Sequence, residues 1–529
     1  ILSSDWSSDV CSSDLQNMKK NTKVLALILA AMMTLSSLAS CSDKGTNGGN
    51  DSETTGGDAA ATETTTSGEE TTAETEEERI KPDIPATADY GGDDINFLFW
   101  QLSSWMGTVR QCRDIYSEGI TGEAINDAVY NRNIKIEDAY KVKIALEMMD
   151  LDKISTAISQ EVNGGTNTYD VMYPRLYDAP SLYQKAYFHN IKKIPNIDLE
   201  KPWWDSNSVE AITCSGYLPA VATSINVNDK DATAAVAFNK TIASNAQLED
   251  IYSLVREGKW TYDKLSTLAE AAYQDLNGDG TMTPDDDLYG LLGGNDVMSC
   301  FYFGSGSRLV THDDTGAFAL TFGSERDINA ATKVVEMMNQ KWFMNHHTIA
   351  NTDDTYYRQL FESGHGLFFW MRLDDVTNMR AGEADFGIIP TPKYEESQDA
   401  YYSMVSQHTT GLLSVPITLT GDKLSEVGMV LEALAAESHY TLIPEYIETS
   451  LKTKNSRDAE SADMLDIIIN NRVFDPMLIY NFGGFADAFM DLGKNNNTDI
   501  ASFIKSKQKV VDKMIKKTTE ALEAADAEA

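Results

Sequence analysis

The segment from Glu257 to Gly290 constrains the fold most, because it specifies a helix and the tight loop that follows it. Thr261 is a favourable helix N-cap, since its hydroxyl can accept a backbone N–H that the first turn leaves unpaired. Trp260, before the cap, and Leu265, four residues after it, have the spacing of a hydrophobic staple. Apolar residues then recur at helical spacing, which predicts one buried face made of Leu265, Leu268, Ala269, Ala272 and Leu276.

The second half of this segment, residues 275–286, is rich in side-chain oxygen atoms and turns tightly. Gly280 permits a sharp bend, and Asp286 stands at the twelfth position, where Asp is shorter than the usual Glu. The spacing is typical of an EF-hand-type loop and predicts one structural Ca²⁺. A polar turn without a metal is the alternative interpretation. The predicted ligands are Asp275, Asn277, Asp279, Thr281 through its carbonyl, and Asp286.

The beginning of the chain predicts export and anchoring. Residues 1–17 repeat Ser-Ser-Asp three times and resemble an assembly artefact, so we expect Met18 to be the true start. Three lysines precede an apolar run, residues 24–35, which is shorter than the about 20 residues of a membrane-spanning helix. The run is typical of a cleaved export signal. Residues 38–41 (LASC) resemble a bacterial lipobox, which implies that Cys41 carries a lipid such as palmitate; a buried helix with an incidental Cys is the alternative.

Residues 42–92 predict a disordered, acidic tether of Thr, Glu, Gly and Ser. Such a composition cannot bury enough apolar surface to offset the entropy of ordering. A lipid anchor followed by this tether would hold a folded domain just outside the cell membrane. The last residues, 521–529, are expected to be a tail.

Composition excludes several kinds of partner. The 529-residue chain has a formal net charge of −38, which disfavours nucleic acids and anionic membrane surfaces. Its length allows two substantial cores. Of five cysteines, Cys112, Cys214 and Cys300 fall in the folded region; their spacing matches no metal site, and it leaves open whether one pair forms a bridge.

Hydrophobic patterns after residue 92 alternate between strand and helix. An apolar strand at 95–100, a helix at 121–140 and a strand at 142–147 are followed by a helix at 154–162 and a strand at 169–173. This order predicts an α/β fold with a mainly parallel sheet. Further strands are expected at 234–239, 318–322, 366–370 and 386–390, and helices at 326–338 and 423–438.

Several motifs together resemble the extracellular solute-binding proteins of bacterial ABC importers, in the carbohydrate-type group related to maltose-binding protein. They are residues 258–265 (GKWTYDKL) with the following loop and Tyr289-Gly290, residues 125–130 (INDAVY), residues 202–205 (PWWD), and residues 386–393 (FGIIPTPK) followed by Tyr401-Tyr402. The resemblance extends from about Asp93 to the final helices. It implies a two-lobed type II fold with a ligand cleft, and lobes at 93–222 with 366–412 and at 223–365 with 413–520.

A carbohydrate site combines aromatic platforms with a few polar acceptors. Aromatic residues near strand ends, with neighbouring acids, are therefore the candidates, although core packing explains any single Trp equally well. We expect about half of the set to contact ligand. The set is Trp100, Trp105, Tyr173, Trp203, Trp204, Asp205, Trp370 and Asp374.

The resemblance implies a monomeric, non-enzymatic protein outside the cell membrane, which captures a sugar or oligosaccharide for permease subunits of an ABC transporter. A secreted glycoside hydrolase is the alternative, because many acids could pair across a scissile bond. A calcium-dependent adhesion module is a third interpretation, which the single loop inside a larger domain disfavours. The sequence contains no G-x-S-x-G, H-E-x-x-H or phosphate-loop motif.

Overall fold

The computed structural model describes residues 79–101, 114–349, 354–379, 382, 384–452 and 459–528. The predicted signal segment, Cys41 and residues 42–78 of the tether lie outside these residues, as do Trp105 and Cys112. None of the helices in the described ranges is both long and apolar enough to cross a lipid bilayer. Cys214 and Cys300 are buried and free.

Strands of the described residues form a three-stranded sheet, a five-stranded sheet and two short pairs. The strands are β1 (Asp93–Gln101), β2 (Val142–Asp150), β3 (Val171–Tyr173), β4 (Ala234–Asn239), β5 (Tyr289–Gly293), β6 (Val310–His312), β7 (Phe318–Leu320), β8 (Phe343–Asn345), β9 (Gly366–Arg372), β10 (Phe386–Ile389), β11 (Ser403–Met404) and β12 (Arg472–Val473).

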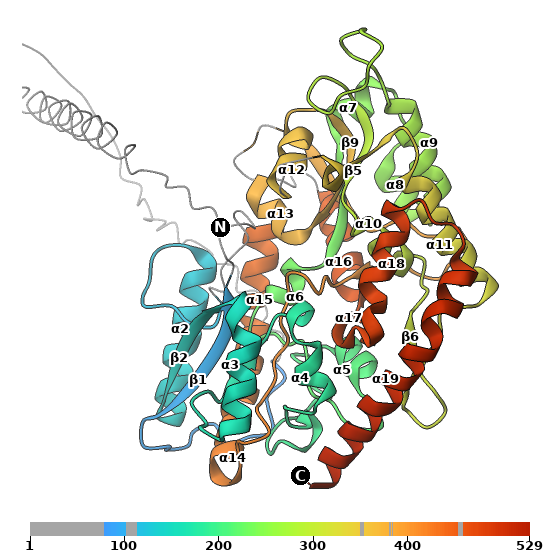
Figure 1. Ribbon diagram of the computed structural model, residues 1–529. Coiled ribbons are helices and arrows are strands. Elements are labelled where there is room, and N and C mark those ends of the chain that lie inside the picture. Colours follow the sequence, from blue (N-terminus) through green and yellow to red (C-terminus); the bar gives the residue numbers. More distant parts are fainter. Residues whose placement is uncertain are drawn as a thin grey trace, which may run out of the picture. The chain divides into compact units, whose positions relative to one another are not determined.

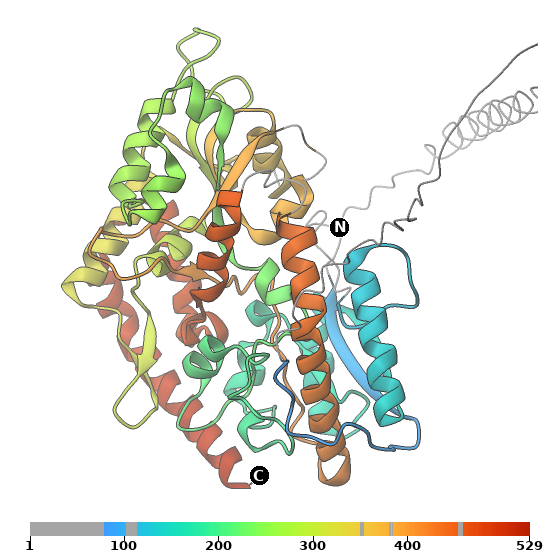
Figure 2. The same cartoon turned by 180° about the vertical axis from the view of Figure 1, so that it is seen from behind.

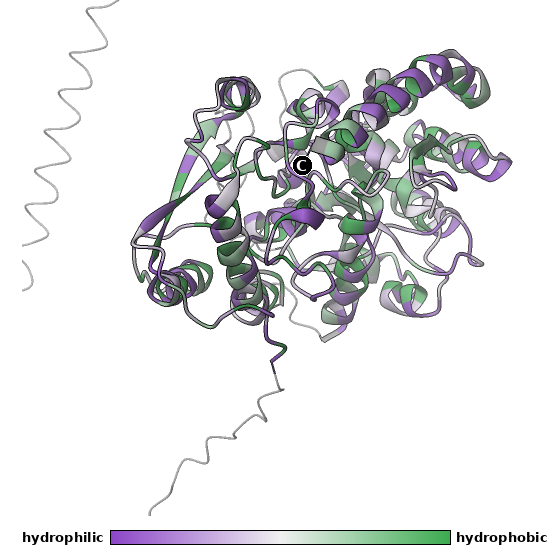
Figure 3. Cartoon of the chain, turned by 90° about the horizontal axis from the view of Figure 1, so that it is seen from below, coloured by the Kyte–Doolittle hydropathy of each residue, from purple (hydrophilic) through white to green (hydrophobic). Residues whose placement is uncertain are grey.

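Helices surround both sheets, and the hydropathy colouring of Figure 3 distinguishes apolar from polar faces along them. They are α2 (Ala124–Tyr140), α3 (Leu151–Gly164), α4 (Pro180–Gln184), α5 (Ser206–Ile212), α6 (Asn228–Asp231), α7 (Lys240–Asn245), α8 (Ile251–Arg256), α9 (Tyr262–Ala272), α10 (Val297–Gly304), α11 (Glu325–Met338), α12 (Asp354–Glu362), α13 (Leu373–Asn378), α14 (Gly421–Tyr440), α15 (Leu442–Glu445), α16 (Ala459–Asn470), α17 (Pro476–Tyr480), α18 (Phe485–Lys494) and α19 (Ile500–Glu528).

The first sheet has the order β2-β1-β3, and all its pairs are parallel, as the sequence pattern predicted. Two parallel neighbours need a crossover connection, and α2 and α3 provide it here. Both helices pack on β2, and Figure 1 shows them beside the blue strand β1. The core strand β1 buries Phe97 and Leu98 completely.

The second sheet has the order β10-β4-β9-β5-β8 and is mixed. β9 pairs in parallel with β5, but β4 runs antiparallel to both β9 and β10. Every residue of β9 is buried, which explains its uninterrupted run of apolar side chains. Figure 1 shows β5 and β9 with α9 and α12 packed around them.

The lobe boundaries predicted from the sequence need correction. Residues 366–412 were assigned to the first lobe, yet β9 and β10 belong to the sheet of β4, β5 and β8. β9 pairs directly with β4, with Val236 in register with Trp370. Conversely, residues 413–440 were assigned to the second lobe, but α14 packs against α2, as the orange and blue-green helices of Figure 2 show.

The helix predicted at residues 261–276 is α9, and its cap is confirmed. Thr261 Oγ1 accepts the backbone N–H of Lys264 at 3.3 Å. The helix ends at Ala272, however, and Leu276 lies in the following loop with half of its surface exposed, so its predicted burial is wrong. Gly290 of β5 lets α9 approach closely, because a Cβ there would lie 2.4 Å from the Ala269 carbonyl oxygen.

Candidate functional site

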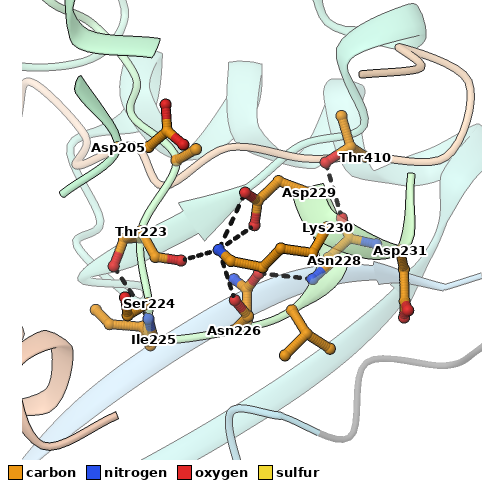
Figure 4. A network of polar contacts seen from close by, with 12 residues as sticks. Asp205, Thr223, Ser224, Ile225, Asn226, Asn228, Asp229, Lys230, Asp231 and Thr410 are labelled. Carbon is orange, nitrogen blue, oxygen red and sulfur yellow. Dashed lines mark hydrogen bonds and ion pairs between the residues drawn. The ribbon is translucent and has the colours of Figure 1, made fainter. Parts of the chain in front are cut away.

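The chain passes from the first sheet to the second through residues 226–233, where α6 carries a buried ion pair. Lys230 Nζ lies 2.9 and 3.0 Å from the two carboxylate oxygens of Asp229 and donates to the Thr223 carbonyl at 2.9 Å (Figure 4). Burial lowers the pKa of Lys230, and the Asp229 charge opposes that shift. Because these partners fix the crossing segment, they position the residues on either side of it.

A group of polar and aromatic side chains lies where strands of both sheets end. Tyr177 follows β3 of the first sheet, and Asp296 follows β5 of the second. His408, from the segment that returns from the second sheet, contacts both. Its ring centroid is 4.5 Å from that of Tyr177, and its Nε2 is 3.6 Å from Asp296 Oδ1. We call Arg175, Tyr177, Asp296 and His408 the Tyr177 group.

Electrostatics in the Tyr177 group favour polar ligands. The Arg175 guanidinium lies 5.3 Å from the centre of the Tyr177 ring and donates to the His408 carbonyl at 3.2 Å. Burial holds the pKa of His408 below its usual value, so its imidazole is neutral near neutral pH. Tyr177 remains 39% exposed. The group therefore holds one partly exposed tyrosine, whose ring is contacted by a cation and a neutral imidazole, and the Asp296 carboxylate lies beside the Nε2 of that imidazole.

Sequence reasoning missed this group, although a signal was present. Ligands of open α/β sheets bind outside the carboxyl ends of strands. Tyr177 comes four residues after the end of the predicted strand at 169–173, so it lies just outside the carboxyl end of that strand, as a ligand-binding residue should. His408 carried no such signal, because it is brought to Tyr177 by long-range contacts that no local pattern specifies.

Two of the predicted ligand residues, Trp100 and Tyr173, lie together at the ends of β1 and β3. Both ring systems stack on Phe99, with centroid distances of 6.0 and 5.0 Å. Trp100 also borders the returning segment, since a Cβ on Gly411 would lie 3.1 Å from Trp100 Nε1. Both side chains are buried, with exposed fractions of 2% and 1%.

Trp203, Trp204 and Asp205 form a second set, which lines a cavity of about 740 Å³ with Lys230 and Arg472. The indole N–H groups of Trp203 and Trp204 donate to the two carboxylate oxygens of Glu432 at 3.1 and 2.9 Å. Asp205 caps α5 by accepting the Ser208 N–H at 2.8 Å, and it pairs with Arg472. Each of these three residues thus has a partner within the fold.

Trp370 and Asp374 form a third set at the carboxyl end of β9. Trp370 lies in the middle of the second sheet and is 1% exposed. Asp374 lies on α13, which packs against α6 of the crossing segment. Burial raises the pKa of Asp374 to about 7, although Arg372, whose Nε is 3.3 Å from Oδ1, acts in the opposite direction.

The predicted calcium loop is a series of turns closed by its own side chains. Asp275 accepts the N–H groups of Gly278 and Gly280 at 2.6 and 2.8 Å. Asp287, rather than Asp286, turns inward and accepts the Leu276 and Thr283 N–H groups. Among the described residues, no three His, Cys, Asp or Glu side chains converge as metal ligands. The oxygen donors suit Ca²⁺ chemically, but their present arrangement does not gather them.

Comparisons with solved structures identify the type of fold. No family model matches the chain, and no curated protein matches it. A cyclo/maltodextrin-binding protein solved with maltotetraose is 13% identical, with a TM-score of 0.51 over 82% of this chain and 98% of its own. UspC from M. tuberculosis is 12% identical, with a TM-score of 0.50 over 82% of this chain and 100% of its own. The predicted two-lobed α/β fold is thus confirmed: it is the fold of a maltodextrin-binding protein along almost that protein's whole length.

Proposed function

We propose that the protein captures a carbohydrate between its two lobes and delivers it to the permease of an ABC importer. The single observation that carries the proposal is the Tyr177 group, in which a partly exposed aromatic ring lies among polar side chains that follow strands of both sheets. A pyranose offers an apolar C–H face and several hydroxyls, so a ring face and nearby hydrogen-bonding groups suit it. The fold shared with a maltodextrin-binding protein supports the same assignment.

Within this proposal, the predicted residues divide by location. Trp100, Tyr173 and Asp374 lie at strand ends next to the crossing segments, so we assign them to the carbohydrate site with the Tyr177 group. Trp105 keeps its predicted role there, although it lies outside the described residues. Buried partners account for the second set, and Trp370 lies within the second sheet with only 1% of its surface exposed. We assign Trp203, Trp204, Asp205 and Trp370 to holding the fold.

The experiment is a calorimetric titration with maltotetraose and other neutral oligosaccharides, followed by recovery of the sugar. Tyr177→Ala should weaken binding of the best ligand by about thirtyfold, because truncating a central aromatic costs about 2 kcal/mol. Tyr187→Ala is a matched control: that tyrosine is also partly exposed, though less than Tyr177, and has a cation, Lys185 Nζ, 5.5 Å from its ring centre. Equal effects of the two variants would contradict the proposed site, and consumption of the sugar would indicate a hydrolase instead.

Two further parts of the proposal concern attachment and metal. The lipobox-like residues 38–41 support anchoring through Cys41, and the acidic tether supports a position just outside the membrane. The oxygen-rich loop supports a structural Ca²⁺. Binding it would require the carboxylates of Asp275 and Asp279 to exchange backbone N–H partners for the ion.

A further inference from the structure

A second cavity, of about 270 Å³, lies where segments distant in sequence meet. Its walls come from α5, from the residues at the start of β6, from Tyr402, and from the end of α16 with β12. None of the residues assigned to the carbohydrate site lines it. Its volume is near the lower end of the about 300–1,000 Å³ found for small-molecule sites. It adjoins the cavity of about 740 Å³ beside Trp203 and Trp204, since Asn207, Glu210, Asn470 and Arg472 line both, and it has room for a small molecule.

Arg308 forms one wall of this cavity and is charged without an ionic partner. Among the described residues, no carboxylate lies within ion-pair distance of its guanidinium, whose Nη1 donates to the Ser307 carbonyl at 2.9 Å. The guanidinium lies 5.0 Å from the centre of the Tyr402 ring. Burial lowers the pKa of Arg308, and the charge of Asp475 opposes that shift. Asp475 is itself occupied, since it accepts the Leu309 and Met477 N–H groups at 2.8 Å.

Arg472 also lines the cavity, and two of its guanidinium nitrogens have no hydrogen-bond acceptor among the described residues. Its Nη2 pairs with Asp205 and lies 3.5 Å from Asp229. Its Nε and Nη1 have no hydrogen-bond acceptor in the described part of the chain, although its side chain is only 5% exposed. A buried N–H without an acceptor costs free energy. Because Nε and Nη1 are enclosed in the present arrangement, a turn of the guanidinium toward the cavity would be needed for a ligand acceptor to relieve this deficit.

The remaining lining residues suit a small polar ligand. Asn207 and Asn470 add amide groups, and Tyr402 adds a ring face. Glu210 is the one acidic residue that lines the cavity, and it is exposed. Of the two guanidinium groups that line the cavity, Arg308 has no carboxylate at ion-pair distance in the described residues, whereas Asp205 and Asp229 balance the charge of Arg472.

We propose that this cavity binds a small anion with a carboxylate or phosphate group, held by Arg308 and Arg472. Guanidinium groups present planar pairs of N–H donors that match both kinds of oxyanion. A volume of about 270 Å³ suits a diffusible small molecule. The proposal does not rest on carbohydrate binding, since the two sites share no residue.

The test is calorimetry and ³¹P NMR of the whole protein with inorganic phosphate, and calorimetry with succinate, each at ionic strength held constant with chloride. One of the two anions should bind saturably at one site, and which one binds identifies the ligand class. Arg308→Gln should weaken that binding by at least roughly tenfold, the loss of one charge-assisted hydrogen bond. Glu210→Gln should strengthen it, because the variant removes the acid at the cavity.

Arg256→Gln is the matched control. Its guanidinium pairs with Glu460 at 2.9 Å and with Asp463 at 3.4 Å, and it does not line the cavity. This variant should bind the anion as the unaltered protein does. The proposal is overturned if neither anion binds saturably, if Arg308→Gln binds normally, or if Arg256→Gln loses binding equally. Should Arg308→Gln fail to fold, the response of Glu210→Gln decides, and unchanged or weaker binding there overturns the proposal.

Discussion

Replacing Trp203 with Phe tests the role that burial gives to the Trp203–Trp204 pair. Trp203 is fully buried, and its N–H is the only donor recorded for Glu432 Oε1 in the described residues, at 3.1 Å. Oε2 keeps a second donor, because it accepts the Asp198 N–H at 3.2 Å besides that of Trp204. Trp203→Phe and Trp204→Phe therefore remove the same atoms, but the first leaves Glu432 Oε1 without a donor in the described residues, whereas the second leaves Oε2 with the Asp198 N–H.

The expected cost follows from that difference. A hydrogen bond to a charged group contributes about 1.5–3 kcal/mol. With the lost ring contacts, Trp203→Phe should lower the free energy of unfolding by about 2–4 kcal/mol. Trp204→Phe should cost about 1 kcal/mol less, because Oε2 still has a donor. Urea unfolding followed by far-ultraviolet circular dichroism measures both, and carbohydrate affinity should stay unchanged in each. A cost below about 0.5 kcal/mol for Trp203→Phe, or a larger cost for Trp204→Phe, would refute the reasoning.

Three further predictions concern pH, metal and anchoring. Burial raises the pKa of Asp374 to about 7. The folded state therefore binds more protons than the unfolded chain, and stability should fall as pH rises from about 4 to 7. Asp374→Asn should flatten that decline in thermal unfolding, and an unaltered slope would show that other groups cause it. Chelation of Ca²⁺ should lower the melting temperature without abolishing the fold; if neither chelator nor Asp279→Ala changes it, the metal proposal is wrong. Cys41→Ser should move the protein from the membrane to the soluble fraction on cell fractionation, and continued membrane retention would contradict lipidation.

Local hydrophobic patterns predicted individual helices and strands well. The helix at residues 326–338 is α11, and the apolar run at 366–370 is β9. What they could not determine was the assignment of strands to sheets. An uninterrupted apolar run shows that β9 is buried on both faces, but its neighbours are set by backbone pairing with residues 130 or so positions earlier, such as Val236 with Trp370. The predicted lobe boundary failed for this reason.

The candidate site shows the same limit. An aromatic residue at a strand end serves equally well as a ligand platform or as part of the core, and the difference depends on partners far away in sequence. Glu432 satisfies the indoles of Trp203 and Trp204 from more than 220 residues away. Tyr177, in contrast, is distinguished by His408, which contacts its ring from a distant part of the sequence and is itself near Asp296.

The measurement that tests the central proposal most directly is equilibrium binding of a neutral oligosaccharide to the purified protein, with recovery of the sugar afterwards. A carrier that closes on its ligand should bind one oligosaccharide of the panel at a one-to-one ratio, return it chemically unchanged, and lose that affinity in Tyr177→Ala but not in Tyr187→Ala. Absence of saturable binding across neutral mono- and oligosaccharides, or conversion of the bound sugar to products, would contradict the proposal that this protein captures carbohydrate for transport.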